Sequence, residues 1–242
     1  MLRLLISCLA ALLFGSCLDC HEEVWLNPDA SGKAKVRMIM PLQAAGIHGG
    51  ENGIRSLITD YLNATPAITS HSVETAVIEG RLKIDITMTF DNALDLVDLT
   101  SGSGSEKLPA AAAALIGHAN MEFRGANVAL QRRIDLTRSI PGSMFIPSDQ
   151  LRGRNLTTII HLPRAATSHN ADTIGDSGKT LIWTTPLASA LRNPVNQSFI
   201  MPLPIPWLMI CGGILAPILL ITGFFYYIYR RKRTKRMAAA RS

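Results

Sequence analysis

The segment RLKIDITMTF, residues 81–90, alternates apolar and polar residues without a break. Its even-numbered residues are all apolar, whereas its odd-numbered residues are charged or carry a hydroxyl group. A period of two indicates an antiparallel strand with one buried and one solvated face. The preceding Glu79-Gly80 favours a tight turn, which predicts a hairpin partner over residues 72–78.

A hairpin and a helix are predicted before this strand. Residues 22–41 predict two strands around a turn that contains Pro28, Asp29 and Gly32. The helix is predicted from apolar residues at helical spacing and ends before Pro66. These apolar residues are Ile54, Leu57, Ile58, Tyr61 and Leu62. A second short helix is predicted over 92–99, with Asp91 as its N-cap.

The remainder of the domain is predicted to be mainly strand. SGSGSEK, residues 101–107, is a connector, and Pro109 begins the short Ala-rich helix PAAAAALIGH. Three further strands are predicted, over 128–136, 156–162 and 180–185, and residues 139–155 are predicted to form a loop. In the first of these strands, Arg132 falls on the same face as the apolar residues. The predicted fold class is α+β, with antiparallel sheets of β-hairpins, short packing helices and one C-terminal transmembrane helix.

Both ends of the chain carry membrane signals. Residues 1–16 combine Arg3, a short apolar run and small residues, which is typical of a signal peptide. Residues 207–229 are uncharged and bounded by Trp207 and three tyrosines, and RRKRTKR follows. This pattern predicts a transmembrane helix with a cytoplasmic basic tail at 230–242. The predicted extracytoplasmic domain is therefore 17–198, with a proline-rich stalk at 199–206.

The net charge of +6 does not describe the predicted extracytoplasmic part. Outside the signal and the tail, sixteen Lys and Arg face all 18 Asp and Glu, which gives about −2. A nucleic-acid surface needs clustered cations, so nucleic acid is not an expected partner.

The sequence SCLDCH, residues 16–21, has three interpretations. Phe14-Gly15-Ser16-Cys17 resembles a bacterial lipobox, which predicts lipid attachment at Cys17. Ordinary signal-peptidase cleavage nearby is the second interpretation. The third is c-type haem attachment through Cys17, Cys20 and His21, because C-x-x-C-H is the haem-binding pattern. An acyl chain on the Cys17 sulfur excludes a haem thioether there.

Three patterns that suggest catalysis or metal binding have simpler explanations. GDSGK, residues 175–179, resembles a serine-protease signature, but Asp-Ser-Gly also favours a hairpin turn. Asp91, Asp95 and Asp98 suggest a cation site or a solvated helix face. The six histidines lie in isolated contexts: His21, His48, His71, His118, His161 and His169. No catalytic, metal-binding or cofactor-binding residue is predicted, and the protein is not expected to be an enzyme.

Several segments together resemble the LppM-type family of bacterial cell-envelope lipoproteins. They are VWLNPDASGKAKVRMIMP (24–41), KIDITMTFDNALDL (83–96) and HLPRAATSHNADTIGDSGKTLIWTTPL (161–187). The resemblance spans roughly 17–235 and departs at the Ala-rich helix and at 139–155. It implies an envelope-anchored α+β domain, and it transfers no site other than the lipidated cysteine.

The expected function is non-catalytic binding or assembly at the cell envelope. The expected partners are membrane lipids and an envelope protein, and the expected location is the cell membrane, with a single pass and an extracytoplasmic N-terminal domain. The alternatives are a membrane-surface hydrolase and a c-type haem carrier. A further hypothesis is that anchors at both ends hold one terminal edge of the domain against the membrane.

Overall fold

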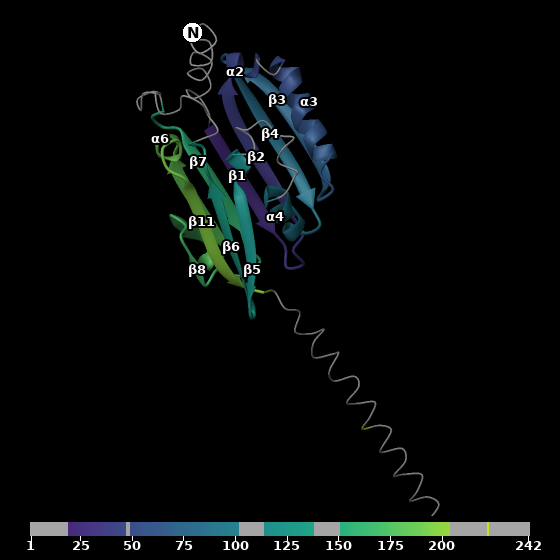
Figure 1. Ribbon diagram of the computed structural model, residues 1–242, viewed down its shortest axis with the longest axis vertical. Helices are drawn as coiled ribbons and strands as arrows, with labels where there is room; N and C mark the ends of the chain where they lie inside the picture. The colour runs from purple at the N-terminus through teal and green to yellow at the C-terminus, as the bar shows by residue number, and fades with distance from the viewer. Residues whose placement is uncertain (1–18, 47–48, 102–113, 138–150, 204–221, 223–242) are drawn as a thin grey trace, which may run out of the picture. The chain divides into compact units, whose positions relative to one another are not determined.

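The computed structural model describes residues 19–46, 49–101, 114–137, 151–203 and 222 (Figure 1). A seven-stranded sheet forms its largest layer. In order across this sheet the strands are β3 (Ile68–Ile78), β4 (Arg81–Phe90), β2 (Gly32–Pro41), β1 (Asp19–Leu26), β7 (Asn155–His161), β10 (Thr180–Pro186) and β9 (Thr173–Gly175). The described part of the chain is therefore α+β, as predicted.

A smaller sheet of four strands packs on the larger one. Its order is β5 (His118–Arg124), β6 (Asn127–Ile134), β11 (Val195–Pro202) and β8 (Ser168–His169). Buried Gln197 of β11 donates from its side-chain nitrogen to Thr158 Oγ1 of β7 at 2.9 Å, which links the two layers. The described helices are α2 (Leu42–Gly46), α3 (Gly50–Asn63), α4 (Ala93–Ser101) and α6 (Leu187–Ala190).

The alternation at residues 81–90 is realised as β4. Leu82 and Ile84 are fully buried, and they pack with Ile54 and Leu62 of α3. The predicted partner strand is β3, and the turn residues Glu79 and Gly80 both have positive φ, at 51° and 72°. Two positive φ values at the turn match the right-handed twist of a two-residue hairpin. The hairpin and its covering helix are therefore confirmed.

One face of the large sheet is covered and the other is open. Helix α3 covers β3, β4 and β2, while the small sheet covers β1, β7 and β10 on the same face. Among the described elements, α3 and the small sheet are the layers that pack on the large sheet. The opposite face carries the odd-numbered residues of β1, β2, β4 and β7, which are mostly polar. This face is the open face of the large sheet.

Strands β1 and β11 begin at the same end of the domain. Cys20 and Val195 pack against the apolar cluster around Leu156. At the other end, Leu26 and Met201 pack against the cluster around Ile160. With about 3.3 Å per residue, the eight residues of β1 span about 25 Å. The first described residue and Leu203 therefore lie at opposite ends of the domain.

Four details differ from the sequence-based expectations. The α4 cap is Asn92, whose Oδ1 accepts from Leu94 N at 3.0 Å, rather than Asp91. Residues 199–202 belong to β11, with Phe199 in the core, so the domain boundary at 198 and the start of the stalk were placed too early. The Ala-rich helix ends by Ile116, because Gly117 has a φ of 73° and β5 begins at His118.

The fourth difference is the pairing of β1 with β7, which is parallel. Parallel neighbours need a long connection, and here the chain runs through most of the domain between them. Periodicity within a strand carries no information about a partner more than a hundred residues away. The expectation of purely antiparallel sheets was therefore wrong for this pair.

Gly32 provides a test of the β1–β2 hairpin. An added Cβ would lie 2.3 Å from the carbonyl oxygen of Trp25 and 2.5 Å from Phe90 Cζ. Because the backbone oxygen cannot move without disrupting the strand pair, Gly32→Ala should cost about 2 kcal/mol of unfolding free energy. Thermal unfolding of the full-length chain in detergent should show a midpoint lower by about 4–8 °C.

Gly46→Ala is the matched control, since an added Cβ there meets nothing within 4 Å. Its melting temperature should equal or slightly exceed that of the parent chain, because Gly46 lies in α2 and helices favour Ala over Gly. Equal melting temperatures for the Gly32 and Gly46 variants would contradict the close approach at β1.

Candidate functional site

A row of polar side chains crosses the open face of the large sheet. Glu23 of β1 lies beside His161 of β7, with 2.9 Å between Oε1 and Nε2. The Nδ1 of His161 is 3.1 Å from Thr180 Oγ1 on β10, and that hydroxyl donates to Asp176 Oδ2 at 2.5 Å. Residues from three strands and the 3₁₀ turn η3 (Asp176–Gly178) are therefore joined in one line.

Sheet register brings these groups together. His161 is level with Trp25 of β1 in the parallel pair and with Thr180 of β10 in the antiparallel pair. The Trp25 and His161 rings stack with centroids 5.2 Å apart and an interplanar angle of 10°. Lys35 Nζ lies 5.6 Å from the Trp25 ring centroid, within cation–π range. The row thus adjoins an aromatic and cationic patch.

The donors and acceptors in the row define its chemistry. A threonine hydroxyl has one proton, and Thr180 gives it to Asp176. Thr180 can then only accept from His161 Nδ1, so that ring nitrogen carries hydrogen. Glu23 Oε1 lies against the other ring nitrogen, so both nitrogens of His161 are engaged by side chains of the row. An activated nucleophile would instead donate its proton to the imidazole.

A second polar cluster connects the two sheets. Arg132 of β6 contacts Glu22 of β1 at 2.5 Å, with only 13% and 21% of the two side chains exposed. The same guanidinium donates to the backbone oxygens of Leu115 and Ile116 at 3.2 and 2.8 Å. Arg132 thus neutralises a half-buried carboxylate and satisfies carbonyls at a helix end. Arg132 lies on the face of β6 whose other residues are apolar, and its pairing with Glu22 explains why a charged residue occurs there.

Cys20 lies beside this ion pair. Burial, followed by the nearby charge of Glu22, raises the pKa of the Cys20 thiol to about 12. At neutral pH the side chain is therefore a protonated thiol, which is a weak nucleophile and a poor metal ligand.

The strand conformation bears on the haem interpretation of SCLDCH. Cys17 lies outside the described residues, whereas Cys20 and His21 are adjacent residues of β1. Adjacent residues of a strand point to opposite faces of the sheet. A c-type haem needs its thioether and its axial imidazole on one side, so this segment of β1 does not present them to one porphyrin.

Of the other motifs, GDSGK forms the turn that ends the polar row, and the rest lie apart from the row. GDSGK forms the last residue of β9 and the turn η3, and Asp176 and Ser177 have positive φ values of 48° and 54°, so the predicted turn is confirmed. The remaining described histidines lie on strands β1, β3, β5 and β8, and His48 is outside the described residues. Within the described ranges no group of three potential metal ligands occurs. The side chain of Asp98 is not described.

A cleft of about 490 Å³ lies where β7 begins and β10 ends. Residues 151–155, Pro186 and Ala188 line it, and they include two arginines, Arg152 and Arg154. The sequence pattern predicts a loop over this segment and gives no indication of a cleft. The two arginines around Gly153 are visible in the sequence, although spacing alone does not reveal a concave surface.

These features define an α+β domain with a two-sheet core, an open polar face and no described membrane-crossing helix. No helix in the described ranges has the length and apolar character needed to span a bilayer, and the predicted span at 207–229 lies outside them except for Thr222. No family model matches the chain, and no curated protein matches it in sequence.

A solved structure shares this fold. It is the folded domain of LppM from Mycobacterium tuberculosis, determined by NMR, with a TM-score of 0.51. The match covers 80% of this chain and 94% of that chain, at 15% sequence identity. The domain therefore has an LppM-like fold, which confirms the resemblance seen in the sequence at the level of the fold.

The Arg132 cluster generates a prediction for stability. Arg132→Met removes the partner of a half-buried Glu22 and two carbonyl contacts, so it should cost about 3 kcal/mol of unfolding free energy. Arg124→Met is the matched control, because Arg124 and Glu122 are paired with about half of each side chain exposed. The control should leave the free energy of unfolding nearly unchanged in chemical denaturation, because solvent screens an exposed pair. Similar losses in both variants would refute a structural role for the inter-sheet pair.

The raised pKa of Cys20 predicts slow thiol chemistry. At pH 8 the folded chain should react with iodoacetamide at Cys20 far more slowly than the urea-unfolded chain, in which the pKa returns toward 9.0. The reaction should accelerate as the pH rises toward 12. Peptide mapping by mass spectrometry measures the modification at each cysteine, and equal folded and unfolded rates at pH 8 would contradict burial of the thiol.

Proposed function

We propose that the chain is a membrane-anchored lipoprotein of the bacterial cell envelope whose extracytoplasmic domain binds a lipid or a protein partner. The LppM-like fold carries this proposal, since the match covers 80% of this chain and 94% of that folded domain. Lipid attachment at Cys17 and a span at 207–229 would hold the domain at the membrane.

The chemistry of the open face supports binding over catalysis. Its polar row satisfies its own donors and acceptors, and its threonine hydroxyl is committed to Asp176. Stacked Trp25 and His161, with Lys35 beside them, offer a flat aromatic surface with a cation at its edge. Such a surface suits contact with a partner and needs no reactive group.

A membrane-surface hydrolase is the second candidate, because the fold assembles a carboxylate, an imidazole and a hydroxyl in sequence. Against it, Thr180 is only 7% exposed and donates away from the imidazole. Ester hydrolysis by the purified chain that disappears in Thr180→Ala, with folding retained, would favour the hydrolase and overturn the binding proposal.

The positions of the domain ends bear on the orientation hypothesis. Cys17 precedes Asp19 by two residues and residue 207 follows Leu203 by four, which gives reaches of about 7 and 13 Å. The two ends of the domain are separated by about the 25 Å length of β1. Two anchors would therefore act at opposite ends of the strands, and the hypothesis of one terminal edge held at the membrane stays a prediction.

Metabolic labelling tests the lipid anchor. An alkyne fatty acid fed to expressing bacteria should label the parent chain and Cys20→Ala, whereas Cys17→Ala should remain unlabelled. Mass spectrometry of the mature N-terminus should find diacylglyceryl-cysteine at residue 17. An unmodified terminus would refute the anchor, and a haem thioether with a Soret band would support the haem carrier instead.

A further inference from the structure

The cleft described above has an unusual distribution of charge. Arg152 and Arg154 line it, and no carboxylate-bearing residue does. The ion pairs among the described residues engage Arg37, Arg124, Arg132 and Arg133, but neither arginine of the cleft. Two cationic side chains thus share a concave surface without a described counter-ion.

Local hydrogen bonds fix the backbone that carries the two arginines. Arg154 N donates to Leu151 O at 3.1 Å, and Leu187 N donates to Arg154 O at 2.9 Å. Gly153 has a φ of 75°, and this left-handed residue makes the turn that leaves both neighbours on the cleft wall. Asn155 adds a side-chain amide as a further donor at the start of β7.

This donor set suits a phosphate group. A guanidinium presents paired N–H groups that match two phosphate oxygens, and an anion removes the charge repulsion between two neighbouring arginines. A volume of about 490 Å³ lies in the usual range for small-ligand sites and exceeds the need of a single inorganic anion. A headgroup larger than phosphate alone fits this space.

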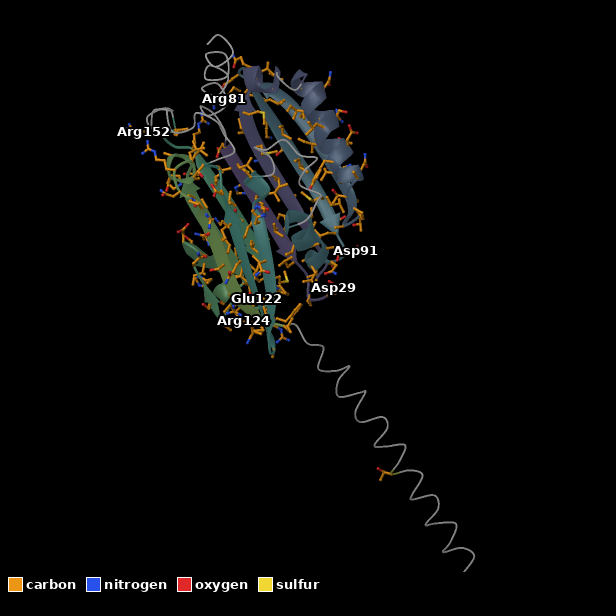
Figure 2. All side chains as sticks on the ribbon, in the orientation of Figure 1. Asp29, Arg81, Asp91, Glu122, Arg124 and Arg152 are labelled. Atoms are coloured by element: carbon orange, nitrogen blue, oxygen red, sulfur yellow. The ribbon has the colours of Figure 1, made fainter. Side chains whose placement is uncertain are left out.

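The position of the cleft indicates the source of the phosphate. Asn155 directly precedes Leu156, which is level with Cys20 in the β1–β7 pair. The cleft therefore lies at the end of the domain where β1 begins, and Cys17 is only three residues before Cys20. Figure 2 shows Arg152 at the same end as Arg81 and opposite to Arg124. An acylated Cys17 would bring this end within about 10 Å of chain from the membrane surface.

We propose that Arg152, Arg154 and Asn155 form a binding site for the phosphate of a membrane phospholipid headgroup. The proposal deepens the proposed function and rests on it for the nearby membrane. The predicted extracytoplasmic part carries a net charge of about −2, so an anionic surface would not attract it as a whole. The two arginines of the site supply a local electrostatic attraction to anionic headgroups at one end of the domain.

Native mass spectrometry of the full-length chain in detergent tests this site. The probe is phosphatidylglycerol, titrated against the parent chain and against Arg152→Gln/Arg154→Gln. The double variant should bind the lipid at least about tenfold more weakly, because two charge-assisted contacts are lost. Arg55→Gln/Arg81→Gln is the control, since it removes two exposed arginines outside the cleft and should bind like the parent chain.

The remaining outcomes each decide the question. Equal lipid binding by the cleft variant and the parent, with matching thermal unfolding, would overturn the site. Inorganic phosphate that binds as tightly as the lipid, and with the same arginine dependence, would overturn the lipid assignment. The mass of the mature N-terminus, read in the same spectra, reports on Cys17 separately, so loss of the cleft and loss of the lipid anchor are distinguishable.

Discussion

The fold depends on the pairing of β1 with two strands from distant parts of the chain. Its antiparallel pair with β2 attaches the β3-β4-β2 half, and its parallel pair with β7 attaches the β7-β10-β9 half. Its even-numbered residues face the small sheet, where Glu22 meets Arg132. A one-residue slip of β1 would exchange its faces, placing Glu23 and Trp25 inside and Cys20 and Glu22 outside. The core and the polar row therefore rely on one register.

Local elements were predictable because their information is local. The alternation at 81–90 and the helical spacing at 54–62 appear as β4 and α3, since each needs only neighbouring residues to bury one face. The parallel β1–β7 pair and the grouping of β5, β6, β11 and β8 depend on contacts across long sequence separations. Glu23, His161 and Thr180 meet only through that register, so the polar row could not be read from isolated histidines. Arg132 was visible in the sequence as a charged residue at an otherwise apolar position, but its pairing with Glu22 was seen only in the structure.

The likeness to LppM at 15% identity has the same physical basis. A sheet with one covered face requires apolar residues at alternate positions, and many different side chains satisfy this requirement. Side chains on the open face have no such constraint and are free to differ between proteins of one fold. Shared architecture therefore says little about the chemistry of this face, which has to be argued from Trp25, His161 and their neighbours.

The opposite placement of the domain ends also has a mechanical consequence. A force applied between Asp19 and Leu203 acts along the strands, since β1 and β11 both start at one end and finish near the other. Pulling in this direction loads the hydrogen bonds of the sheets in shear, so many hydrogen bonds must break at the same time. A hairpin pulled at two neighbouring ends would instead open one bond at a time. The direction of its strands makes this domain suited to bearing tension between its two ends.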